Sequence, residues 1–548
     1  MLGLMQSQPL LISTIIEHAA RHHADAEIVS RTIEGGTGVD GGMHRCTYAA
    51  ANRRAKKLAN ALIRQGVKLG DRVGTLAWNG YRHFELYYGI SGLGAVMHTI
   101  NPRLFPEQIA WIANHAEDSL LFFDLTFLPI VERIAAQLPD CRAFVLMTDR
   151  AHMPAGSTVP NLLCYEDLIA PESDVMTWPE FDENTASSLC YTSGTTGNPK
   201  GALYSHRSTV LHTYASALPD SLGCAARDSI LPVVPMFHVN SWGLAYSCPL
   251  VGAKLVLPGA QLDGKSLYDL FEAEQVTFSA GVPTVWQGLL GHVKQHQLKF
   301  STLKRTVIGG SSCPPAMIKT FQDDYGVKVL HAWGMTEMSP IGTVCNFKNK
   351  HAGWSAEEQF AVEVTAGRAV YGVDMKIVND AGEELPWDGK AFGDLLVKGY
   401  SVIRGYFKGD GGDPLRDGWF PTGDVGTISP DGYLQITDRS KDVIKSGGEW
   451  ISSIDLENIA AAHPAVAQAA VIGIAHPKWD ERPLLVVVKR PGAEVTREEL
   501  LQFFEGKIAK WWLPDDVAFT DAIPLGATGK MLKTKLREQF KAYKLPTA

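Results

Sequence analysis

The strongest chemical signal in the sequence is YTSGTTGNPKG, residues 191–201, which follows the short β-like run SSLC. Besides the tyrosine, this segment holds three glycines, four hydroxyl side chains and a lysine. Glycines let the backbone approach a ligand closely, and successive N–H groups with Ser and Thr hydroxyls can bind an anion. It is not a Walker A loop, because Asn198 follows Gly197 where that loop needs lysine. The segment predicts a phosphate-binding loop rather than the alternative, a flexible surface loop.

Four further motifs follow in the order HAWGMTEMSP (331–340), PTGD (421–424), DRSKDVIKSGGEWIS (438–452) and PLGATGKMLK (524–533). In this order the five motifs resemble the signature of the acyl-adenylate-forming superfamily, which includes acyl-CoA synthetases, peptide-synthetase adenylation domains and beetle luciferases. The resemblance covers nearly the whole chain. It implies an enzyme that uses ATP to activate a carboxylic acid as its acyl-AMP and passes the acyl group to coenzyme A, with Mg²⁺ as cofactor.

The resemblance implies a role for each polar residue of the motifs. Residues 192–200 should surround the β- and γ-phosphates of ATP, and Thr336 should contact the α-phosphate. Glu337 and Thr192 should hold Mg²⁺; a carboxylate here would otherwise repel ATP, so a bridging cation accounts for Glu337. The residues that the resemblance assigns to ATP and AMP are Thr192, Ser193, Gly194, Thr195, Thr196, Gly197, Lys200, Gly310, Ser311, Ser312, His331, Ala332, Trp333, Gly334, Met335, Asp424 and Arg439.

Within that set, the nucleoside contacts are the most specific. Asp424 should accept hydrogen bonds from the ribose hydroxyls with help from Arg439, and Trp333 should offer a ring face beside the adenine. Ser311 and Ser312 lie where the family lines the adenine pocket. Taken alone, Asp424 and Trp333 would be read as ordinary turn or core residues, and only their place in an ordered set of motifs favours binding.

The segment PMFHVNSW (235–242) is where the family places the acyl group. His238 should lie near the acyl carboxylate, and Trp242 resembles the gating tryptophan of some fatty acyl-CoA synthetases. Gly310 and Gly334 complete the expected acyl pocket. A histidine or tryptophan in an apolar stretch is just as often a core residue, so both interpretations stay open.

The C-terminal lysine motif carries the sharpest single expectation. In the family, Lys530 inserts between the acyl carboxylate and the α-phosphate, where its charge offsets developing negative charge, so Lys530, Thr336, Glu337 and His238 form the expected catalytic set. Here LGAT precedes Gly529, where many relatives have Lys-Thr-x-x. The small domain should then rotate about Lys441 for the thiol step. The residues expected to face the thiol are Lys445, Gly447, Gly448, Glu449 and Trp450.

The elements that must position these motifs follow from the hydrophobic pattern. From about residue 71 to about 340, short β-rich runs alternate with amphipathic helical runs, as in SLLFFD (119–124) followed by LPIVERIAAQL (128–138). This alternation predicts parallel strands with crossover helices. Strand-like segments dominate from 367 to 437, and a small α+β unit follows. We therefore expect an α/β protein with a large domain of layered parallel-rich sheets and a β-rich subdomain.

The expected domain limits are 1–437 for the large domain, 438–442 for the hinge and 443–548 for the small mobile domain. In the small domain, AQAAVIGIA (467–475) and PLLVVVK (483–489) predict strands, and TREELLQFFEGKIAKW (496–511) predicts a helix. Thr496 and Glu499 have the spacing of a capping box at its start.

The composition narrows the class of protein. A net charge of −8 without a dense basic run argues against nucleic acid as a partner. Eight cysteines without a C-x-x-C pair, and an N-terminus unlike a signal peptide, favour the reducing cytoplasm. Residues 229–253 lack Asp, Glu, Lys and Arg, but their prolines and polar residues predict buried chain lining a cavity rather than a membrane span. Relatives are often dimers, so a homodimer is compatible with the resemblance.

The segment 71–118 resembles the medium-chain acyl-CoA synthetases and the bacterial 3-methylmercaptopropionate-CoA ligases, and the likeness to the latter extends to EIVSR (27–31). The expected acid is therefore 3-methylmercaptopropionate or a similar short- to medium-chain acid, with a medium- or long-chain fatty acid as the alternative. A peptide-synthetase module, a luciferase-type oxygenase, another thiol acceptor and a non-catalytic nucleotide-binding protein are the competing classes. The presence of Glu337, Asp424, Arg439 and Lys530 disfavours the last.

Overall fold

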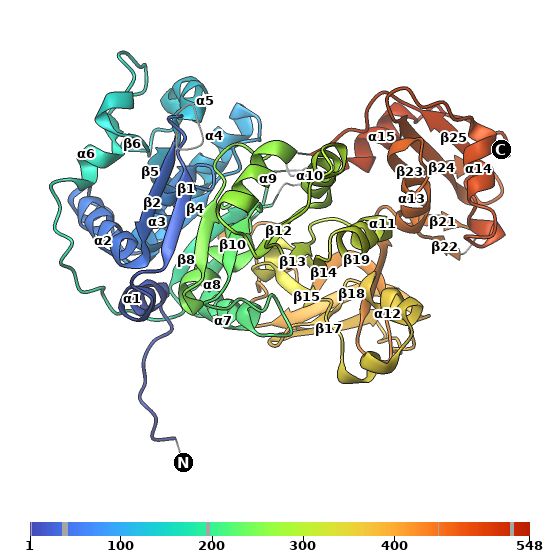
Figure 1. The fold of residues 1–548 in the computed structure, drawn as a ribbon, viewed down its shortest axis with the longest axis horizontal. Helices are drawn as coiled ribbons and strands as arrows, with labels where there is room; N and C mark the ends of the chain where they lie inside the picture. Colours follow the sequence, from blue (N-terminus) through green and yellow to red (C-terminus); the bar gives the residue numbers. More distant parts are fainter. Residues whose placement is uncertain (2, 36–41, 193–197, 448, 527–530) are drawn as a thin grey trace.

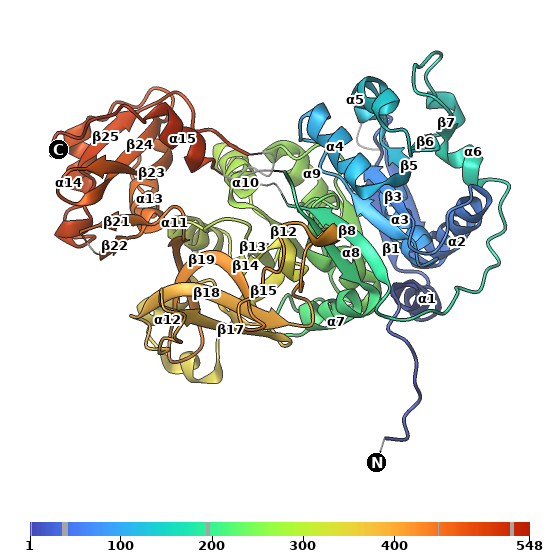
Figure 2. The same cartoon turned by 180° about the vertical axis from the view of Figure 1, so that it is seen from behind.

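The computed structural model describes residues 1, 3–35, 42–192, 198–447, 449–526 and 531–548. Within them the strands form four sheets: two large parallel-rich sheets, a four-stranded antiparallel sheet and a small C-terminal sheet (Figure 1). Helices cover the faces of the large sheets, and the C-terminal unit projects to one side (Figure 2). The predicted α/β fold with a large N-terminal part and a small C-terminal part is confirmed.

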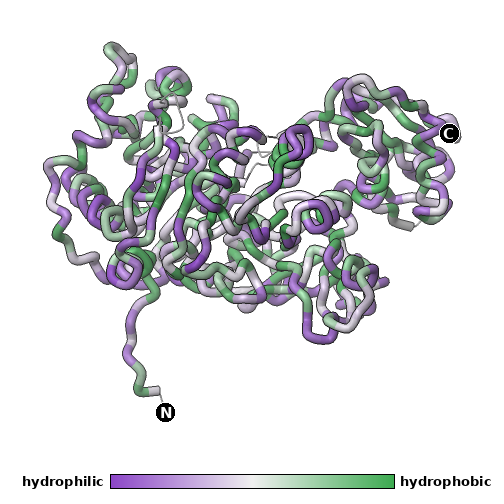
Figure 3. The backbone as a smooth tube through the Cα atoms, viewed as in Figure 1, coloured by the Kyte–Doolittle hydropathy of each residue, from purple (hydrophilic) through white to green (hydrophobic). Residues whose placement is uncertain are grey.

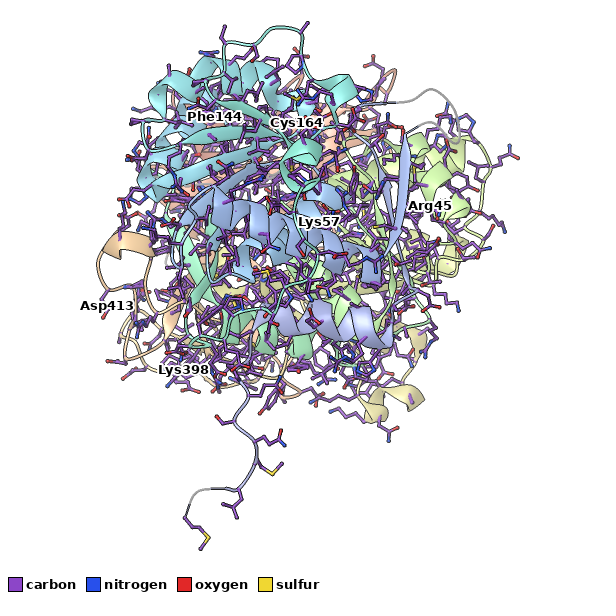
Figure 4. All side chains as sticks on the ribbon, turned by 90° about the vertical axis from the view of Figure 1, so that its left-hand side faces the viewer. Arg45, Lys57, Phe144, Cys164, Lys398 and Asp413 are labelled. Carbon is purple, nitrogen blue, oxygen red and sulfur yellow. The ribbon has the colours of Figure 1, made fainter. Side chains whose placement is uncertain are left out.

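One large sheet has seven strands in the order β7-β6-β5-β3-β4-β8-β9, parallel except for β9. Its strands are β3 (Arg72–Leu76), β4 (Val96–Thr99), β5 (Asp118–Phe123), β6 (Ala143–Leu146), β7 (Leu162–Cys164), β8 (Ala186–Tyr191) and β9 (Gly201–Ser205). Helices α3 (Tyr81–Ser91), α4 (Pro106–Ala116), α5 (Leu128–Ile134) and α6 (Tyr165–Ile169) connect or follow them. The alternation predicted from residue 71 is therefore confirmed. Phe144 and Cys164, on neighbouring strands β6 and β7, are labelled in Figure 4.

The other large sheet has nine strands in the order β16-β15-β14-β13-β12-β10-β11-β1-β2, parallel from β14 to β1. Its strands are β1 (Glu27–Arg31), β2 (Met43–Thr47), β10 (Ser229–Pro232), β11 (Lys254–Leu257), β12 (Phe278–Gly281), β13 (Arg305–Ile308), β14 (Lys328–Gly334), β15 (Ile341–Val344) and β16 (Arg368–Ala369). The associated helices are α1 (Ile12–His22), α2 (Tyr48–Arg64), α7 (His206–Ala217), α8 (Leu244–Val251), α9 (Gly264–Ala273), α10 (Pro283–Gln295), α11 (Pro315–Lys319) and α12 (Ala356–Glu363).

Side-chain alternation along the strands builds the layers. On β5, Leu120 and Phe122 enter the core shared with α1, α2, α3 and α8, whereas Leu121 and Phe123 enter a second core beneath α4 and α5. Successive residues of a strand point to opposite faces, so β5 serves two cores at once. Helices α9, α10 and α11 close a third core on the outer face of the nine-stranded sheet. The large part is thus a stack of helix, sheet, helix, sheet and helix layers.

The charge-free stretch 229–253 is buried chain, as predicted from its polar residues. It forms β10, a short helical turn at Val239–Gly243 and α8, and most of its residues are buried. Among the described residues, no helix is long and apolar enough to cross a membrane. Figure 3 shows hydrophobic and hydrophilic residues interleaved along the chain.

The four-stranded antiparallel sheet carries two of the motifs to the edge of the large sheets. Its strands, in spatial order, are β17 (Val373–Val378), β18 (Phe392–Gly399), β19 (Phe420–Ile428) and β20 (Leu434–Arg439). Asp424 on β19 is the cross-strand partner of Arg439 on β20. Residues 424 and 439, fifteen positions apart in sequence, are thereby brought into one site.

The C-terminal unit is a sheet with helices on both faces. Its elements are β21 (Ile444–Ser446), β22 (Glu449–Ile451), α13 (Ser453–Ala461), β23 (Val466–His476), β24 (Asp480–Lys489), α14 (Arg497–Phe503), β25 (Asp516–Phe519) and α15 (Lys533–Gln539). Val471 and Leu485 pack with α13 and α14, whereas Ile472 and Leu484 pack with α15. The strands predicted at 467–475 and 483–489 are confirmed as β23 and β24.

The helix predicted over 496–511 is shorter than expected. Its capping box is present, since the Thr496 hydroxyl accepts from the Glu499 N–H while the Glu499 carboxylate accepts from the Thr496 N–H. However, α14 ends at Phe503, and Gly506 follows with φ +72°. A glycine in the left-handed region commonly ends a helix, so Ile508 lies beyond the helix rather than on its face.

The C-terminal unit is tied to β20 through Asp438. Asp438 Oδ2 accepts hydrogen bonds from the Ser453 backbone N–H at 2.8 Å and from the Ser453 hydroxyl at 2.5 Å. Lys533, which is almost fully buried, donates to Ser453 and pairs with Glu457 Oε1 at 2.7 Å. A buried charge network thus joins the end of β20 to α13 and α15.

Candidate active site

A cavity of about 720 Å³ lies at the carboxyl ends of the parallel strands β10, β12, β13 and β14. Ligands of open α/β sheets commonly bind at this edge, because the loops that leave the strands converge there. Strands β19 and β20 close a second side with Asp424 and Arg439, and the C-terminal unit contributes Asp455, Asn458 and Lys507.

Most of the residues expected from the motifs meet in this cavity. Those that line it are Thr192, His238, Trp242, Gly310, Ser311, Ser312, His331, Ala332, Trp333, Gly334, Met335, Thr336, Glu337, Asp424 and Arg439. Lys200, Lys441, Lys445 and Gly447 are described but do not line it. Outside the described residues lie Ser193, Gly194, Thr195, Thr196, Gly197, Gly448 and Lys530, together with the side chains of Glu449 and Trp450.

Asp424 is held by two partners on the side of the cavity that β19 and β20 close, which is the expected nucleotide side. The Trp333 indole N–H donates to Asp424 Oδ2 at 2.8 Å, and Arg439 Nε lies 3.5 Å from Oδ1. Asp424 is only 8% exposed, so these contacts offset the cost of burying its charge. Each carboxylate oxygen can accept more than one hydrogen bond, and the group is therefore fixed while still able to accept from a ligand hydroxyl.

Glu337 is oriented by a tyrosine that the motifs do not contain. The Tyr406 hydroxyl donates to Glu337 Oε1 at 2.8 Å, and Lys200 Nζ lies 4.9 Å from the centre of the Tyr406 ring. Burial, and then the Glu337 carboxylate, raise the pKa of Tyr406, so the hydroxyl remains a donor. Tyr406 thus links the lysine of the phosphate loop to the buried carboxylate.

The backbone around Thr336 is equally constrained. The Tyr204 hydroxyl donates to the Thr336 carbonyl oxygen at 2.5 Å. A Cβ atom at Gly334 would lie 2.0 Å from the Pro340 carbonyl oxygen, so the turn that presents Thr336 requires glycine there. On the neighbouring strand end, burial lowers the pKa of His331, whose Nδ1 lies 3.2 Å from the Val364 carbonyl oxygen.

The side of the cavity formed by residues 235–242, which is the expected acyl side, is built differently, from a left-handed turn. The four residues from Val239 to Trp242 are not glycine, yet each has a positive φ, between +40° and +56°. Such backbone costs roughly 1–2 kcal/mol per residue and persists only where the surroundings hold it. The Asn240 amide donates to the Ser188 hydroxyl at 3.0 Å, and the Ser241 hydroxyl donates to the Val234 carbonyl at 2.9 Å. These bonds fix the turn from both sides.

This turn places the Trp242 ring against a pair of glycines. A Cβ atom at Gly309 would lie 3.3 Å from Trp242 Cη2, and one at Gly310 would lie 3.5 Å from Cζ2. Trp242 is 8% exposed and belongs to the main core as well as to the cavity wall. The two interpretations left open by the sequence, core and cavity wall, therefore both describe its position. His238 stands at the start of the turn and lines the cavity.

Two of the residues expected to serve the thiol step are described: Lys445 lies on β21 of the C-terminal sheet, and Gly447 directly follows that strand. The Lys445 backbone N–H donates to Glu481 Oε2 at 3.1 Å. Gly447 has φ +60°, and a Cβ atom there would approach Trp479 Cε3 to 3.0 Å. Lys441 lies beside Arg537, which donates to the Lys441 carbonyl oxygen at 3.3 Å.

Sequence reasoning missed several residues at the site. Tyr406, Tyr204 and Arg103 contact the motif residues or line the cavity, and Asp455 and Lys507 face it from the C-terminal unit. Each lies outside the recognised strings, and their proximity comes from the fold rather than from local spacing. Tyr204 and Tyr406 are uncharged and offered no local signal, and the charges of Arg103, Asp455 and Lys507 do not by themselves distinguish these residues from other charged residues of the chain.

Comparison with known proteins gives consistent results over the whole chain. Residues 16–407 match the model of the AMP-binding enzyme family, and residues 455–530 match that of the AMP-binding enzyme C-terminal domain. The chain is 56% identical over 541 residues to the 3-methylmercaptopropionyl-CoA ligase of Ruegeria lacuscaerulensis, with 99% of each chain covered. It is 52% identical over 540 residues to the medium-chain-fatty-acid–CoA ligase of Ectopseudomonas oleovorans, with 98% of each covered.

Solved structures share the fold. The anthranilate CoA ligase AuaEII in complex with anthranoyl-AMP superposes with a TM-score of 0.86 at 24% identity, covering 98% of each chain. ATP-bound MatB from Rhodopseudomonas palustris superposes with a TM-score of 0.80 at 25% identity, covering 96% of this chain and all of that one. Because the family model covers more than half of the chain and full-length relatives share more than half of its residues, the chain belongs to the AMP-binding enzyme family.

Proposed function

We propose that this protein is an AMP-forming acyl-CoA synthetase. The observation that carries the proposal is the meeting, in one cavity, of a held carboxylate at Asp424, a buried carboxylate at Glu337 and an apolar wall that includes Trp242. The first two suit a nucleotide with its metal, and the third suits a carbon chain. The CoA ligases among the relatives support coenzyme A as the thiol.

The reaction has two steps. A carboxylate oxygen attacks the α-phosphorus of ATP, the bond from that phosphorus to the bridging oxygen breaks, and pyrophosphate leaves. The sulfur of coenzyme A then attacks the acyl carbon, and AMP leaves with the electrons of the acyl–oxygen bond. In the first step Thr336 would contact the α-phosphate, Asp424 and Arg439 would orient the ribose, and Lys530 would offset charge developing at the α-phosphate.

The donor set around Glu337 fits Mg²⁺. The described residues contain no cluster of three or more His, Cys, Asp or Glu side chains able to hold a metal. Mg²⁺ bound to a nucleotide needs only one or two protein oxygens, because phosphate and water oxygens complete its octahedron. Glu337 with the Thr192 hydroxyl would supply them, and the bound ion would screen the phosphate charge. Tyr406 would keep the Glu337 carboxylate turned toward that position.

For the acid, we propose 3-methylmercaptopropionate or a similar short- to medium-chain acid. The support is the identity of 56% and 52% to ligases named for 3-methylmercaptopropionate and for medium-chain fatty acids. One methylene in an apolar pocket changes discrimination by only about 1–3 kcal/mol, so the two classes overlap in what such a wall can accept. A long-chain ligase of Thermus thermophilus, 44% identical, supports a longer acid as the second candidate.

We further propose residues 438–442 as the hinge between a large domain at 1–437 and a small domain at 443–548. Rotation about Lys441 would bring Lys445, Gly447, Gly448, Glu449 and Trp450 to the acyl-AMP, and the glycines would admit the narrow thiol arm. The eight cysteines are free thiols, which supports a reducing cytoplasm, and a homodimer is compatible with the family.

The proposal is tested by following AMP, ADP and acyl-CoA with a panel of acids from acetate to dodecanoate, including 3-methylmercaptopropionate. We expect acid- and CoA-dependent release of AMP and pyrophosphate, with the highest kcat/KM for an acid of short to medium length. Acid-dependent ADP would reject the mechanism. AMP release without acyl-CoA would instead leave an adenylating enzyme with another thiol acceptor, and light or CO₂ released from the acyl-AMP would indicate an oxygenase.

A further inference from the structure

Arg103 is a cation at the cavity that no motif predicts. It follows β4, whose Thr99 is the parallel partner of Cys190 on β8. Thr192, at the start of the phosphate loop, follows Cys190 by two residues, so Arg103 and Thr192 leave the same edge of adjacent strands. Both line the cavity.

Two aromatic rings flank the Arg103 guanidinium. Its central carbon lies 5.9 Å from the centre of the Trp78 ring and 5.7 Å from that of Phe237. Phe237 immediately precedes His238, at the beginning of the acyl-side segment. Stacking on rings orients a guanidinium while leaving its N–H groups available for an anion. Arg103 therefore lies near the strand end that leads to Thr192 and beside Phe237 of the acyl side.

In the part of the chain that the structure describes, no carboxylate forms an ion pair with Arg103, and no nearby charge contributes to the shift of its pKa. Packing against the rings partly desolvates the guanidinium and lowers the pKa of Arg103. Many arginines of the protein do have such partners, as Arg82 pairs with Glu166 and Arg305 with Asp228. A desolvated cation at a binding cavity is stabilised when an anionic ligand arrives.

We propose that Arg103 binds an oxyanion of the substrates, either a phosphate oxygen of ATP and pyrophosphate or the carboxylate of the acid. The inference rests on the proposed function for the identity of these anions. A guanidinium presents paired N–H donors that match both phosphate and carboxylate, which is why the shared chemistry is an oxyanion. Arg103 would hold that anion while Arg439, beside Asp424, serves another part of the cavity.

The experiment measures binding as well as turnover. Dissociation constants for MgATP, magnesium pyrophosphate and 3-methylmercaptopropionate are obtained by titration calorimetry on the wild type, Arg103→Met and Arg103→Lys. Binding requires no catalysis, so a wild type that binds MgATP but makes no acyl-CoA would count against the proposed function and not against Arg103. Arg133→Met is the matched control, because Arg133 is exposed on α5 and pairs with Glu107.

We expect Arg103→Met to raise the dissociation constant of one of these anions by about 10- to 100-fold, because a charge-assisted hydrogen bond is lost. Arg103→Lys should recover part of the affinity. Weaker MgATP and pyrophosphate binding together would identify phosphate, and weaker acid binding alone would identify the carboxylate. The inference is overturned if all three affinities stay within twofold of the wild type. It is also overturned if Arg103→Met lowers the melting temperature and kcat alone, since that would mark a structural residue.

Discussion

The nucleotide side and the acyl side of the cavity are held by different forces. On the nucleotide side, Asp424 and Glu337 are fixed by hydrogen bonds from Trp333 and Tyr406. On the acyl side, Trp242 is fixed by packing on two glycines at the end of a left-handed turn. Hydrogen bonds fix the direction from which a ligand group must approach, whereas packing fixes the volume that is left for the ligand. The comparison teaches that changes on the nucleotide side should affect every acid alike, and changes on the acyl side should reorder the acids.

The largest expected effect tests whether adenylation and thiol transfer depend on different residues. Lys530 lies outside the described residues, so this prediction rests on the sequence. Lys530→Ala should slow acid-dependent adenylation by about 10²- to 10³-fold for every acid, because a placed charge is lost from the first transition state. Acyl-CoA formation from supplied acyl-AMP should stay near the wild-type rate.

Lys445→Ala is the matching variant for the second half-reaction. It should slow the transfer from acyl-AMP to coenzyme A more than adenylation. Equal loss of both half-reactions in a folded Lys530→Ala protein would mean that no rearrangement separates the two steps.

The next effect concerns Asp424. Asp424→Ala leaves the Trp333 N–H and Arg439 without their partner, and it should raise the KM for ATP by about 10- to 100-fold. The factor should be the same for butyrate, octanoate and 3-methylmercaptopropionate. Asp374→Ala, at an exposed position on β17 of the same antiparallel sheet and outside the cavity lining, is the control. A factor that varied with the acid would show that the two sides are not independent.

A smaller change should appear on the acyl side. Trp242→Ala opens volume beside Gly309 and Gly310, and it should shift the ratio of kcat/KM for octanoate over 3-methylmercaptopropionate by about tenfold in favour of octanoate. The KM for ATP should not move. Trp387→Ala, at a 39% exposed tryptophan away from the cavity lining, controls for loss of an indole. An unchanged acid profile would make Trp242 a core residue only.

The smallest effect tests the support of Glu337. Tyr406→Phe removes one hydrogen bond and keeps the ring under Lys200, so the Mg²⁺ concentration for half-maximal rate should rise about fivefold. The order of acids should stay the same. Tyr400→Phe, whose hydroxyl donates to the Tyr371 carbonyl at 3.0 Å, is the matched control. If Mg²⁺ dependence is unaltered while stability falls, Tyr406 is a packing residue.

Motifs named residues on both sides of the cavity, but they did not show what holds those residues in place. Glycine and hydroxyl residues suit the binding of a phosphate group, which marked the segment that contains Thr192, whereas Thr336 was named through the resemblance of its motif; what they bind stays a prediction. The left-handed turn at 239–242 could not be read locally, because Ser188 and Val234 stabilise it from elsewhere. Tyr406 was missed because it reaches Glu337 across 69 residues of chain.

The secondary structure shows the same limit. The alternation of strands and helices from residue 71 could be predicted, because a strand or helix that is buried on a given face has apolar residues at the spacing of that face. The end of α14 could not be predicted in this way. The helical spacing of apolar residues continues to Ile508, but α14 ends at Phe503 and Gly506 has a left-handed φ. Local pattern identifies an element, whereas a single backbone angle decides where it stops.

At the end of β20, the neighbouring residues Asp438 and Arg439 contact two different parts of the molecule. Arg439 contacts Asp424 at the cavity, and Asp438 accepts from Ser453 in the C-terminal unit. One peptide bond therefore separates a residue of the cavity wall, proposed to contact the nucleotide, from an attachment of the C-terminal unit. Any preference of the nucleotide for one placement of that strand end is, by thermodynamic reciprocity, a preference of the C-terminal unit for one orientation. For the rotation proposed about Lys441, conversion of ATP to acyl-AMP would then shift the equilibrium between the orientations of the C-terminal unit.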